Sequence, residues 1–350
     1  MDRLKKSKYY PVIGGVSVTI ALLTVHYVYK NVYRPHMRRM TLEDAELLFQ
    51  LPPVENVRMT TFNFVTILLA VQLISTYAAG PVRHISEDEL KKFVENLLEN
   101  DENNAGSLVN LNLQARSPYN STEDLAPDVL LKVDPKAFKL PTVSLLARFY
   151  DNYIPDSMKN EEVTPEEIKE EEAFMNAIVT TRVMTLTRTF LSSKGMAPES
   201  AAEFTKFLRK SWFSIYSRGA KKKGSSAFEH IFLGEFKKGQ VSGLHNWLFF
   251  TNQEKAKHLN YYGWTKKIEF PKKKGGVIKL RYAWNGLLKP AGSMFFGTSP
   301  EFELALYTVC FLARPNDRCN LAIGQKNFHI QTYTFTYDNN FLISSAYPQI

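Results

Sequence analysis

Two histidines lie fifteen residues apart in the stretch AFEHIFLGEFKKGQVSGLHNW, which covers residues 227–247. The tetrapeptide KKGQ between them is typical of the loop of a β-hairpin, so we expect a strand on either side of it. A register that pairs Phe236 with Val241 places His230 and His245 diagonally on one face of this hairpin. The spacing therefore predicts two imidazoles that bracket one phosphate-sized group, provided that no bulge or one-residue slip separates them.

Two such imidazoles suit the cleavage of RNA by its own 2′-hydroxyl group. A neutral imidazole takes the proton of the 2′-OH, and a protonated imidazole gives a proton to the departing 5′-oxygen. Histidine serves both roles because its ordinary pKa of about 6.5 allows both forms near neutral pH. A lysine completes this chemistry by stabilising charge on the phosphoryl oxygens. Two packed histidines without a catalytic role are the alternative interpretation.

The net charge of +9 is unevenly distributed along the 350 residues. Residues 84–205 hold 12 basic and 22 acidic side chains, whereas residues 206–290 hold 19 basic and 4 acidic ones. Both histidines lie in the basic stretch. Such a concentration of lysine and arginine favours a polyanionic partner, most commonly a nucleic acid, and a solvated lysine-rich surface is the alternative.

The elements that must position these residues follow the order of helices first and strands second. Capping residues and apolar stripes predict three helices, over about 86–100, 164–193 and 199–217. Five later runs predict strands: VIKLRYAW, SMFFGTS, ELALYTVCFLA, FHIQTYTFTY and FLISSAY. This order predicts an α+β fold in which a helical part, 84–217, precedes antiparallel β-sheets in a catalytic part, 218–350.

Two apolar segments of about twenty residues precede this domain. The first, residues 9–29, lies in an N-terminal tail of residues 1–58, has no charged side chain and is long enough to span a bilayer. The second, residues 59–80, is a further transmembrane segment or a signal peptide, because the small-residue tail STYAAG follows its apolar centre. A buried core helix is the alternative for each. Basic residues between the segments favour a cytoplasmic loop and a lumenal or extracellular remainder.

Cysteine usage and one sequon also suit a secretory compartment. Cys310 and Cys319 flank the turn signal RPND, so they either form a disulfide across a short hairpin or remain two buried thiols. Asn120-Ser121-Thr122 is an acceptor for N-glycosylation. We therefore expect a membrane-anchored protein with a lumenal or extracellular catalytic domain, or a secreted one if cleavage follows residues 59–80.

Four sequence blocks resemble the EndoU family of XendoU-like, uridylate-specific endoribonucleases. They are SSAFEHIFLGE, VSGLHNW, LLKPAGS followed by FFGTSPEFE, and SSAYP. Their order and spacing match the family over roughly residues 84–350, and the resemblance does not extend to residues 1–83. It implies an α+β nuclease fold, and a monomer that cleaves single-stranded, uridine-rich RNA and leaves 2′,3′-cyclic phosphate ends.

The resemblance also implies roles for individual residues. By position, His230, His245 and Lys289 match the catalytic residues of the family, whose members suggest His245 as general base and His230 as general acid. Three further residues match positions that bind the substrate. They are Ser293, linked to uracil recognition, Ser345, where several relatives have threonine, and Tyr347, which holds the base or the sugar.

Animal members of the family are typically activated by Mn²⁺ or Ca²⁺, and Glu229 and Glu235 match carboxylates considered important there. On one extended strand these two residues would lie about 20 Å apart and point away from the face of His230. One ion therefore cannot bind both unless Gly234 marks a bulge. Bonding to the backbone or to a lysine is the alternative role, and acidic residues of 84–205 are another source of ligands. The chain has no CxxC and no HExxH.

Two other functions are compatible with the same residues. The basic region suits a non-catalytic RNA-binding module that holds RNA without cutting it. It also suits a membrane-anchored interaction protein whose lysines meet anionic lipid headgroups.

Overall fold

The computed structural model describes residues 84–118, 121–218, 222–337 and 340–350. The two predicted membrane or signal segments, 9–29 and 59–80, and the sequon residue Asn120 lie outside these ranges. Within the described ranges, no helix combines the length and the apolar character that crossing a bilayer requires.

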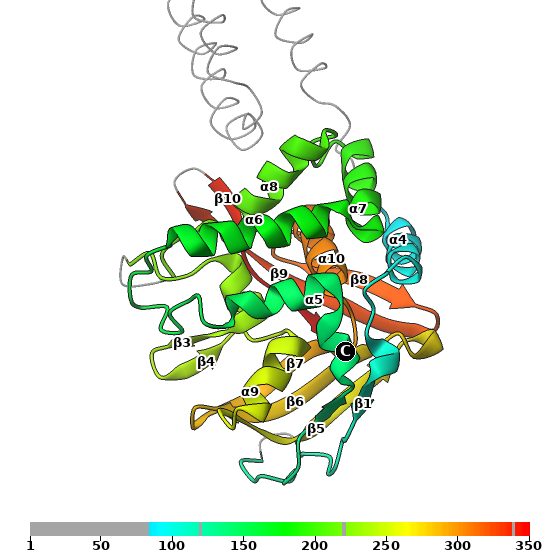
Figure 1. Cartoon of the computed structure of the whole chain (residues 1–350). Coiled ribbons are helices and arrows are strands. Elements are labelled where there is room, and N and C mark those ends of the chain that lie inside the picture. The colour runs from blue at the N-terminus through cyan, green and yellow to red at the C-terminus, as the bar shows by residue number, and fades with distance from the viewer. Residues whose placement is uncertain (1–83, 119–120, 219–221, 338–339) are drawn as a thin grey trace, which may run out of the picture. The chain divides into compact units, whose positions relative to one another are not determined.

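The helical part packs beside the sheets (Figure 1). Its α-helices are α4 (Glu87–Glu99), α5 (Pro141–Leu146), α6 (Pro165–Thr180), α7 (Arg182–Ser193) and α8 (Ala201–Phe213). Capping boxes begin α4 at Ser86 and α6 at Thr164, and both helices start where the sequence predicts. The prediction of one helix over 164–193 is wrong, because Thr181 has an extended backbone (φ −66°, ψ 155°) and its side chain caps α7.

Short elements link the helices to the rest of the fold. The 3₁₀ turns are η2 (Gly106–Leu108), η3 (Pro135–Lys139), η4 (Ala147–Tyr150) and η6 (Pro271–Lys273). Strands β1 (Val109–Leu111) and β2 (Leu131–Val133) form a small antiparallel pair, as do β3 (Glu235–Lys237) and β4 (Gln240–Ser242).

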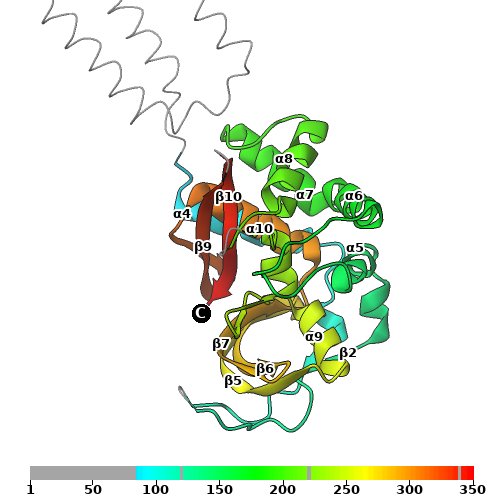
Figure 2. The same ribbon diagram turned by 90° about the vertical axis from the view of Figure 1, so that its left-hand side faces the viewer.

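Two three-stranded antiparallel sheets form the β-rich part. One contains β5 (Leu259–Glu269), β6 (Gly276–Trp284) and β7 (Leu287–Phe296), with β6 in the middle. It curves strongly, and α9 (Trp247–Lys255) packs against β5 and β7 (Figure 2). The other contains β8 (Arg318–Ile323), β9 (Lys326–Tyr337) and β10 (Asn340–Gln349), with β9 in the middle. The predicted α+β fold and four of the five predicted strand runs are confirmed.

The fifth run, ELALYTVCFLA, is not a strand but most of helix α10 (Pro300–Ala313). Ser299 caps the helix with its side chain, and Pro300 occupies its first turn, where a proline costs no hydrogen bond. All side chains from Pro300 to Phe311 are buried, so the segment has no polar face to reveal a helical period. Helix α10 packs against β9 and β10, and in Figure 2 it lies on one side of their sheet.

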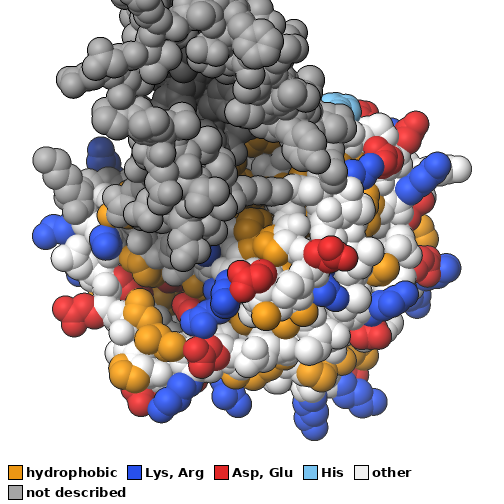
Figure 3. All heavy atoms as spheres, turned by 90° about the horizontal axis from the view of Figure 1, so that it is seen from above, with side chains coloured by type: hydrophobic (Ala, Val, Ile, Leu, Met, Phe, Trp, Pro, Cys, Tyr) orange, Lys and Arg blue, Asp and Glu red, His pale blue; other side chains and the backbone are white. Residues whose placement is uncertain are grey.

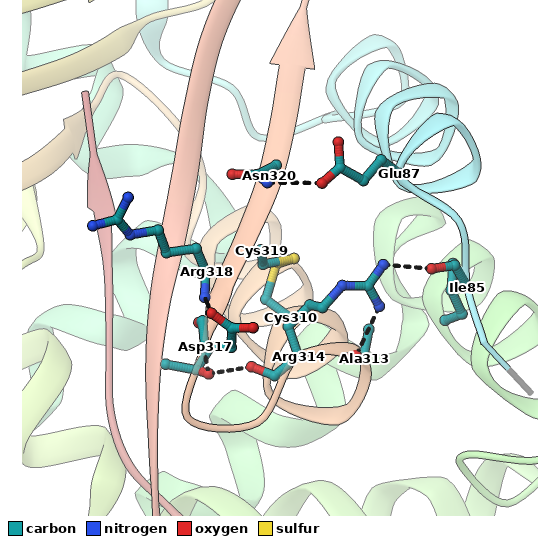
Figure 4. The surroundings of a disulfide bond; sticks show 10 residues. Ile85, Glu87, Cys310, Ala313, Arg314, Asp317, Arg318, Cys319 and Asn320 are labelled. Atoms are coloured by element: carbon teal, nitrogen blue, oxygen red, sulfur yellow. Dashed lines mark hydrogen bonds between the residues drawn. A yellow bond between two sulfur atoms is a disulfide. The ribbon is translucent and has the colours of Figure 1, made fainter. Parts of the chain in front are cut away.

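Cys310 and Cys319 form a disulfide, with their Cα atoms 5.5 Å apart. Of the two alternatives that the sequence leaves open, the disulfide is therefore the one present, and it joins the last turn of α10 to β8 rather than the two strands of a hairpin. Arg314 donates a hydrogen bond to the carbonyl of Ile85, and Asn320 donates one to Glu87, so the start of α4 is fastened beside the disulfide (Figure 4).

The charge of the described surface is mixed on the face shown in Figure 3. Lysine and arginine side chains alternate there with aspartate and glutamate side chains. Where its side chains are described, this face therefore shows no continuous basic patch of the kind that binds nucleic acid.

Candidate active site

The stretch that carries the two histidines is not the long hairpin that its sequence predicts. Phe236 does pair with Val241, but the ladder extends only from Glu235 to Ser242, across a tight turn at Lys238 and Gly239. Residues Glu229–Leu233 form a π-helical turn, η5, and Gly234 ends it with φ +85°. The hydroxyl of Ser226 accepts a hydrogen bond from the Glu229 amide, and the Glu229 carboxylate accepts one from the Ser226 amide. This capping box starts a helical turn where a strand was expected.

The histidines nevertheless lie together, by a different route. The loop after β4 packs on η5, where the amide of Leu244 bonds the carbonyl of His230 at 3.0 Å and the amide of His245 bonds that of Ile231 at 2.8 Å. Gly243 permits this approach. Its φ is +67°, and a Cβ atom there would lie 1.8 Å from the carbonyl oxygen of His230.

His245 is held with one ring nitrogen bonded and the other free. Its Nδ1 lies 2.7 Å from the carbonyl oxygen of Ser293, and since a carbonyl only accepts, Nδ1 carries the proton. The Nε2 atom is therefore unprotonated and has no hydrogen bond to any described residue. Burial, together with the charge of Lys289, lowers the pKa of His245 well below its ordinary value. The ring of Tyr347 stacks on the imidazole at 4.8 Å and 18°.

His230 has different neighbours. Its Nε2 lies 3.1 Å from the hydroxyl of Ser345, and its Nδ1 lies 3.2 Å from a carboxylate oxygen of Glu235. The second contact has the distance of an ion pair but not the angle of a well-formed hydrogen bond. Burial, and then the charge of Arg218, lower the pKa of His230 to about 4, while Glu235 acts in the opposite direction. The imidazole is therefore neutral at neutral pH in the protein without substrate.

Glu235 is an ionised carboxylate at the centre of a buried network. Arg218 Nε lies 2.7 Å from one of its oxygens, and the hydroxyl of Ser225 donates to the same oxygen. Burial alone would raise the pKa of Glu235, but the charges of His230 and Arg218 hold it at about 2. Since His230 is neutral at neutral pH, we attribute the ionised state of Glu235 mainly to Arg218.

Lys289 reaches the same cluster from β7. Its ammonium group donates a hydrogen bond to the carbonyl of Gly243, in the loop that leads to His245. Burial lowers the pKa of Lys289 to about 8, against the opposing effect of Glu235. The lysine therefore stays largely charged at neutral pH, beside both imidazoles.

The three expected substrate-binding residues also meet at this site. Ser345 contacts His230, and Tyr347 stacks on His245, both from β10. Ser293, on β7, is 2% exposed, and its Oγ has no hydrogen-bond partner in the described part of the chain. A buried hydroxyl without a partner is unusual in a folded protein, and this one keeps its capacity to donate and to accept a hydrogen bond.

Glu229 and Glu235 do not fit a shared Mn²⁺ or Ca²⁺ site. The estimate of about 20 Å between them is wrong in its reasoning, because residues 229–233 form a helical turn and not a strand. Glu235 is instead occupied by Arg218, Ser225 and His230, whereas Glu229 bonds Ser226 and lies beside Glu161. Burial, and then the neighbouring carboxyl of Glu161, raise the pKa of Glu229 well above its ordinary value. No group of three His, Cys, Asp or Glu side chains suited to a metal occurs among the described residues.

One residue of this site, Arg218, is not distinguished by the sequence. It lies in a loop beside three lysines, and nothing in its spacing distinguishes it from them. In the structure its guanidinium is buried, pairs with Glu235, donates to the carbonyls of Ser226 and Ser344, and lies 4.9 Å from the ring of Tyr216. A planar donor fork suits such a position better than a lysine ammonium.

The α+β fold and this cluster define a site for acid–base chemistry, with two imidazoles in different surroundings and a lysine beside them. The model of the family Endoribonuclease XendoU matches residues 89–348. The uridylate-specific endoribonuclease EndoU of Drosophila melanogaster is 34% identical over 265 residues, which cover 75% of this chain and 82% of the relative. The uridylate-specific endoribonuclease of Bos taurus is 36% identical over 269 residues, which cover 73% of this chain and 63% of the bovine protein.

A solved structure is similar over nearly its whole length. The structure of XendoU, described as a splicing independent snoRNA processing endoribonuclease, is 34% identical, with a TM-score of 0.61. The match covers 75% of this chain and 96% of that chain. The chain therefore belongs to the XendoU family of endoribonucleases, and its homologues are uridylate-specific endoribonucleases. The family predicted from the four sequence blocks is confirmed.

Proposed function

We propose that this protein cleaves single-stranded RNA at uridylates by attack of the 2′-hydroxyl on the adjacent phosphate. The 2′-oxygen forms a bond to phosphorus, the bond to the 5′-oxygen breaks, and the products are a 2′,3′-cyclic phosphate and a 5′-hydroxyl. The observation that carries the proposal is that His245 and His230 have different partners at the nitrogens facing away from the reaction.

His245 is the general base. The carbonyl of Ser293 fixes the proton on Nδ1, so Nε2 presents a lone pair to the 2′-hydroxyl. No carboxylate contacts this imidazole within the described residues, and Lys289 disfavours its protonation. The unprotonated form that a base requires is therefore the form that the site favours.

His230 is the general acid. Glu235 lies at its Nδ1 and favours the protonated ring, which is the form that can give a proton to the 5′-oxygen. A bound phosphodiester brings a further negative charge close to His230, and this charge raises the pKa of the imidazole from its low value in the free protein. The surroundings of His230 and His245 thus differ in how they favour a proton, and this difference assigns His230 as the acid and His245 as the base.

The remaining residues bind and stabilise the substrate. Lys289 carries a positive charge beside both imidazoles and offsets the charge that develops on the phosphoryl oxygens. The unpartnered hydroxyl of Ser293 is available to a uracil oxygen or N–H, while the ring of Tyr347 packs beside His245 and faces the base or the sugar. Ser345 is a hydroxyl beside His230 that can bond the base on the same side.

The test is cleavage of an oligonucleotide with a single ribouridine in a 2′-deoxy background. His230→Ala, His245→Ala and Lys289→Ala should each lower kcat by about 10²- to 10⁴-fold while RNA binding survives. A substrate whose leaving 5′-oxygen is replaced by sulfur needs no general acid, so it should rescue His230→Ala and not His245→Ala. Wild-type rates in all three variants would reject the site. Wild-type protein that binds RNA and yields no cyclic phosphate would indicate a non-catalytic RNA-binding module.

Dependence on Mn²⁺ or Ca²⁺ is proposed from the family alone. Dialysis of the full chain against a chelator should abolish cleavage, and either ion should restore it. Undiminished cleavage in the chelator would show that this chain differs from its animal relatives.

We also propose that the protein is a monomer of the secretory pathway. The disulfide between Cys310 and Cys319 supports an oxidising compartment. Its anchoring by residues 9–29 and 59–80, or its release after 59–80, is tested by separating the membranes of expressing cells from the medium. A glycan on Asn120 would place the catalytic domain in the lumen.

A further inference from the structure

The face of β9 that adjoins the candidate site carries three aromatic side chains in a row. Tyr333, Phe335 and Tyr337 alternate with Thr334 and Thr336, so the aromatic rings share one face of the strand. We call these three residues the aromatic stripe. The opposite face of β9 is the one that packs on α10, with Phe328, Ile330 and Thr332 buried there.

The aromatic stripe is exposed although its members are large. Tyr333 is 45% and Phe335 is 37% exposed, and both are among the most exposed large apolar side chains of the described chain. The stripe is also rigid, because the buried ring of Tyr216 stacks beneath Phe335 at 5.3 Å and 21°, and Tyr337 lies 6.3 Å from Phe335 at 20°. The rings of Phe335 and Tyr337, held in nearly parallel planes, therefore form a surface of defined shape.

The stripe is continuous with the candidate site. Tyr333 pairs with Ser345 across the sheet, and its ring lies 6.3 Å from that of Tyr347 at 28°. Tyr347 in turn stacks on His245. A row of aromatic rings thus runs from the general base to the outer end of β9.

The direction of the row follows from the two histidines. Tyr347 lies against His245 and Ser345 lies against His230, and the stripe extends from Ser345 away from Tyr347. A chain that follows the stripe therefore leaves the site on the side of His230. In the proposed reaction His230 protonates the 5′-oxygen of the departing nucleotide, so this side receives the RNA that follows the cleaved bond.

We propose that the aromatic stripe is a stacking platform for the bases that follow the cleaved uridylate on its 3′ side. Single-stranded nucleic acids bind by stacking successive bases on aromatic side chains, without a requirement for sequence. The same face of β9 otherwise carries the polar side chains Asn327, His329 and Gln331 and no aliphatic one in the described residues. Bases present flat π-faces that stack on such rings, so a row of aromatic side chains beside polar ones favours bases as the occupant.

This inference rests on the proposed function for its direction, and its test uses three substrates with one ribouridine each. They are a dinucleotide, the same dinucleotide extended by three deoxyadenosines on the 3′ side, and one extended on the 5′ side. For the wild-type full chain, the 3′ extension should raise kcat/KM. Phe335→Ala should lower kcat/KM about 5- to 150-fold on the 3′-extended substrate and leave the other two unchanged.

Phe341→Ala is the matched control. Phe341 is 43% exposed and lies on the same sheet, but it pairs with Thr336, so it projects from the face opposite the stripe, and it stacks on Phe311 of α10. Phe341→Ala should therefore change kcat/KM by the same factor on all three substrates. Replacing the three 3′ bases by abasic sites should abolish the difference between wild type and Phe335→Ala, because the phosphates remain and only the stacking partners are removed.

An equal loss on all three substrates, or no loss on the 3′-extended one, would overturn the proposal. A loss confined to the 5′-extended substrate would overturn the direction. Binding of oligonucleotides with 2′-fluorouridine, which cannot be cleaved, separates the stripe from the reaction. A wild type that fails to cleave RNA, together with weaker binding of the 3′-extended analogue by Phe335→Ala, would reject the proposed reaction and support the aromatic stripe as a binding surface.

Discussion

Among the described residues, the cluster of buried ionisable side chains around His230 and His245 can be compared with the cluster at the start of α10. In the second cluster, burial raises the pKa of Glu301 to about 7 and that of Glu303 to about 8. Both carboxyl oxygens of Glu303 are bonded, by Thr298 and by Asn246. Both oxygens of Glu301 are likewise bonded, by neighbouring polar side chains.

The histidine cluster has shifts of comparable size but leaves reactive atoms without partners. Nε2 of His245 and Oγ of Ser293 have no hydrogen bond within the described residues. A shifted pKa therefore reports burial in both clusters, whereas free bonding capacity distinguishes Nε2 of His245 and Oγ of Ser293 from the carboxyl oxygens of Glu301 and Glu303. The two are also connected, because Asn246, which Glu303 holds, follows His245 directly and caps α9.

The largest loss of kcat is expected from Glu235→Gln, which removes the carboxylate charge that favours protonated His230. The general acid is then further disfavoured, so kcat should fall about 10²- to 10³-fold. Since Glu235 raises the pKa of His230, its loss should also move the alkaline limb of the pH–rate profile to lower pH. Arg218 is left buried without its partner, which costs about 3–5 kcal/mol of unfolding free energy.

A double variant distinguishes the effect of Glu235 on kcat from its effect on the free energy of unfolding. Arg218→Met combined with Glu235→Gln removes both charges, so denaturant unfolding should show much of the stability restored. Its kcat should stay low, because His230 still lacks a carboxylate. Recovery of both quantities together would show that Glu235 acts through folding alone.

The next largest loss of kcat is expected from a change in the backbone that brings the two histidines together. Gly243→Ala places a Cβ atom 1.8 Å from the carbonyl oxygen of His230, so the loop that carries His245 must move. A displacement of about 1 Å at reacting groups costs about 10²-fold, and kcat should fall by that factor. Steady-state cleavage of the single-ribouridine substrate measures it.

Gly239→Ala is the matched control for Gly243→Ala. Gly239 also has a positive φ, +73°, but nothing lies within 4 Å of a Cβ atom there. Its replacement should cost about 1–2 kcal/mol of stability from backbone strain and leave kcat unchanged. Equal loss of kcat in both variants would mean that strain, and not the contact with His230, controls the site.

The same backbone shows where the sequence was informative. The helix starts at Ser86 and Thr164 depend on neighbouring residues, so the sequence predicts both correctly, and the pairing of Phe236 with Val241 follows from a short turn. The capping box of Ser226 and Glu229 has the same pattern, but the surrounding apolar residues were interpreted as a strand. A short apolar segment does not distinguish a buried strand from a buried helix, which also explains the error at α10.

The site could be predicted in its residue types and not in its contacts. The blocks around His230, His245 and Lys289 identify the family, and the structure brings these residues together. Arg218 and Ser293 act through partners that are distant in the chain, Glu235 and His245, and the bond from His245 to the Ser293 carbonyl spans 48 residues. Such contacts depend on the packing of η5 against β10 and of β4 against β7, which no local pattern specifies.

The smallest effect on kcat is expected from Glu303→Gln, which tests whether the carboxyl groups at the start of α10 have a structural role only. The folded-state pKa of Glu303, about 8, lies above its ordinary value of 4.5, so its contribution to stability is fully present below about pH 4.5. That contribution is lost as the pH rises to about 8, by about 1.4 kcal/mol per pH unit for one such group. Glutamine cannot ionise, so Glu303→Gln should unfold at higher denaturant concentration than wild type at pH 9 and lose this advantage at pH 5.

The kcat of Glu303→Gln should stay within about twofold of wild type at neutral pH. Asn246 caps α9 through its own oxygen, which accepts from the amides of Leu248 and Phe249, and the variant leaves those bonds in place. A tenfold loss of kcat would show that Glu303 positions His245 through Asn246, and the carboxylates of α10 would then belong to the catalytic machinery. An unchanged pH dependence of unfolding would instead show that burial does not raise the pKa of Glu303. The two clusters would then not share pKa values shifted by burial.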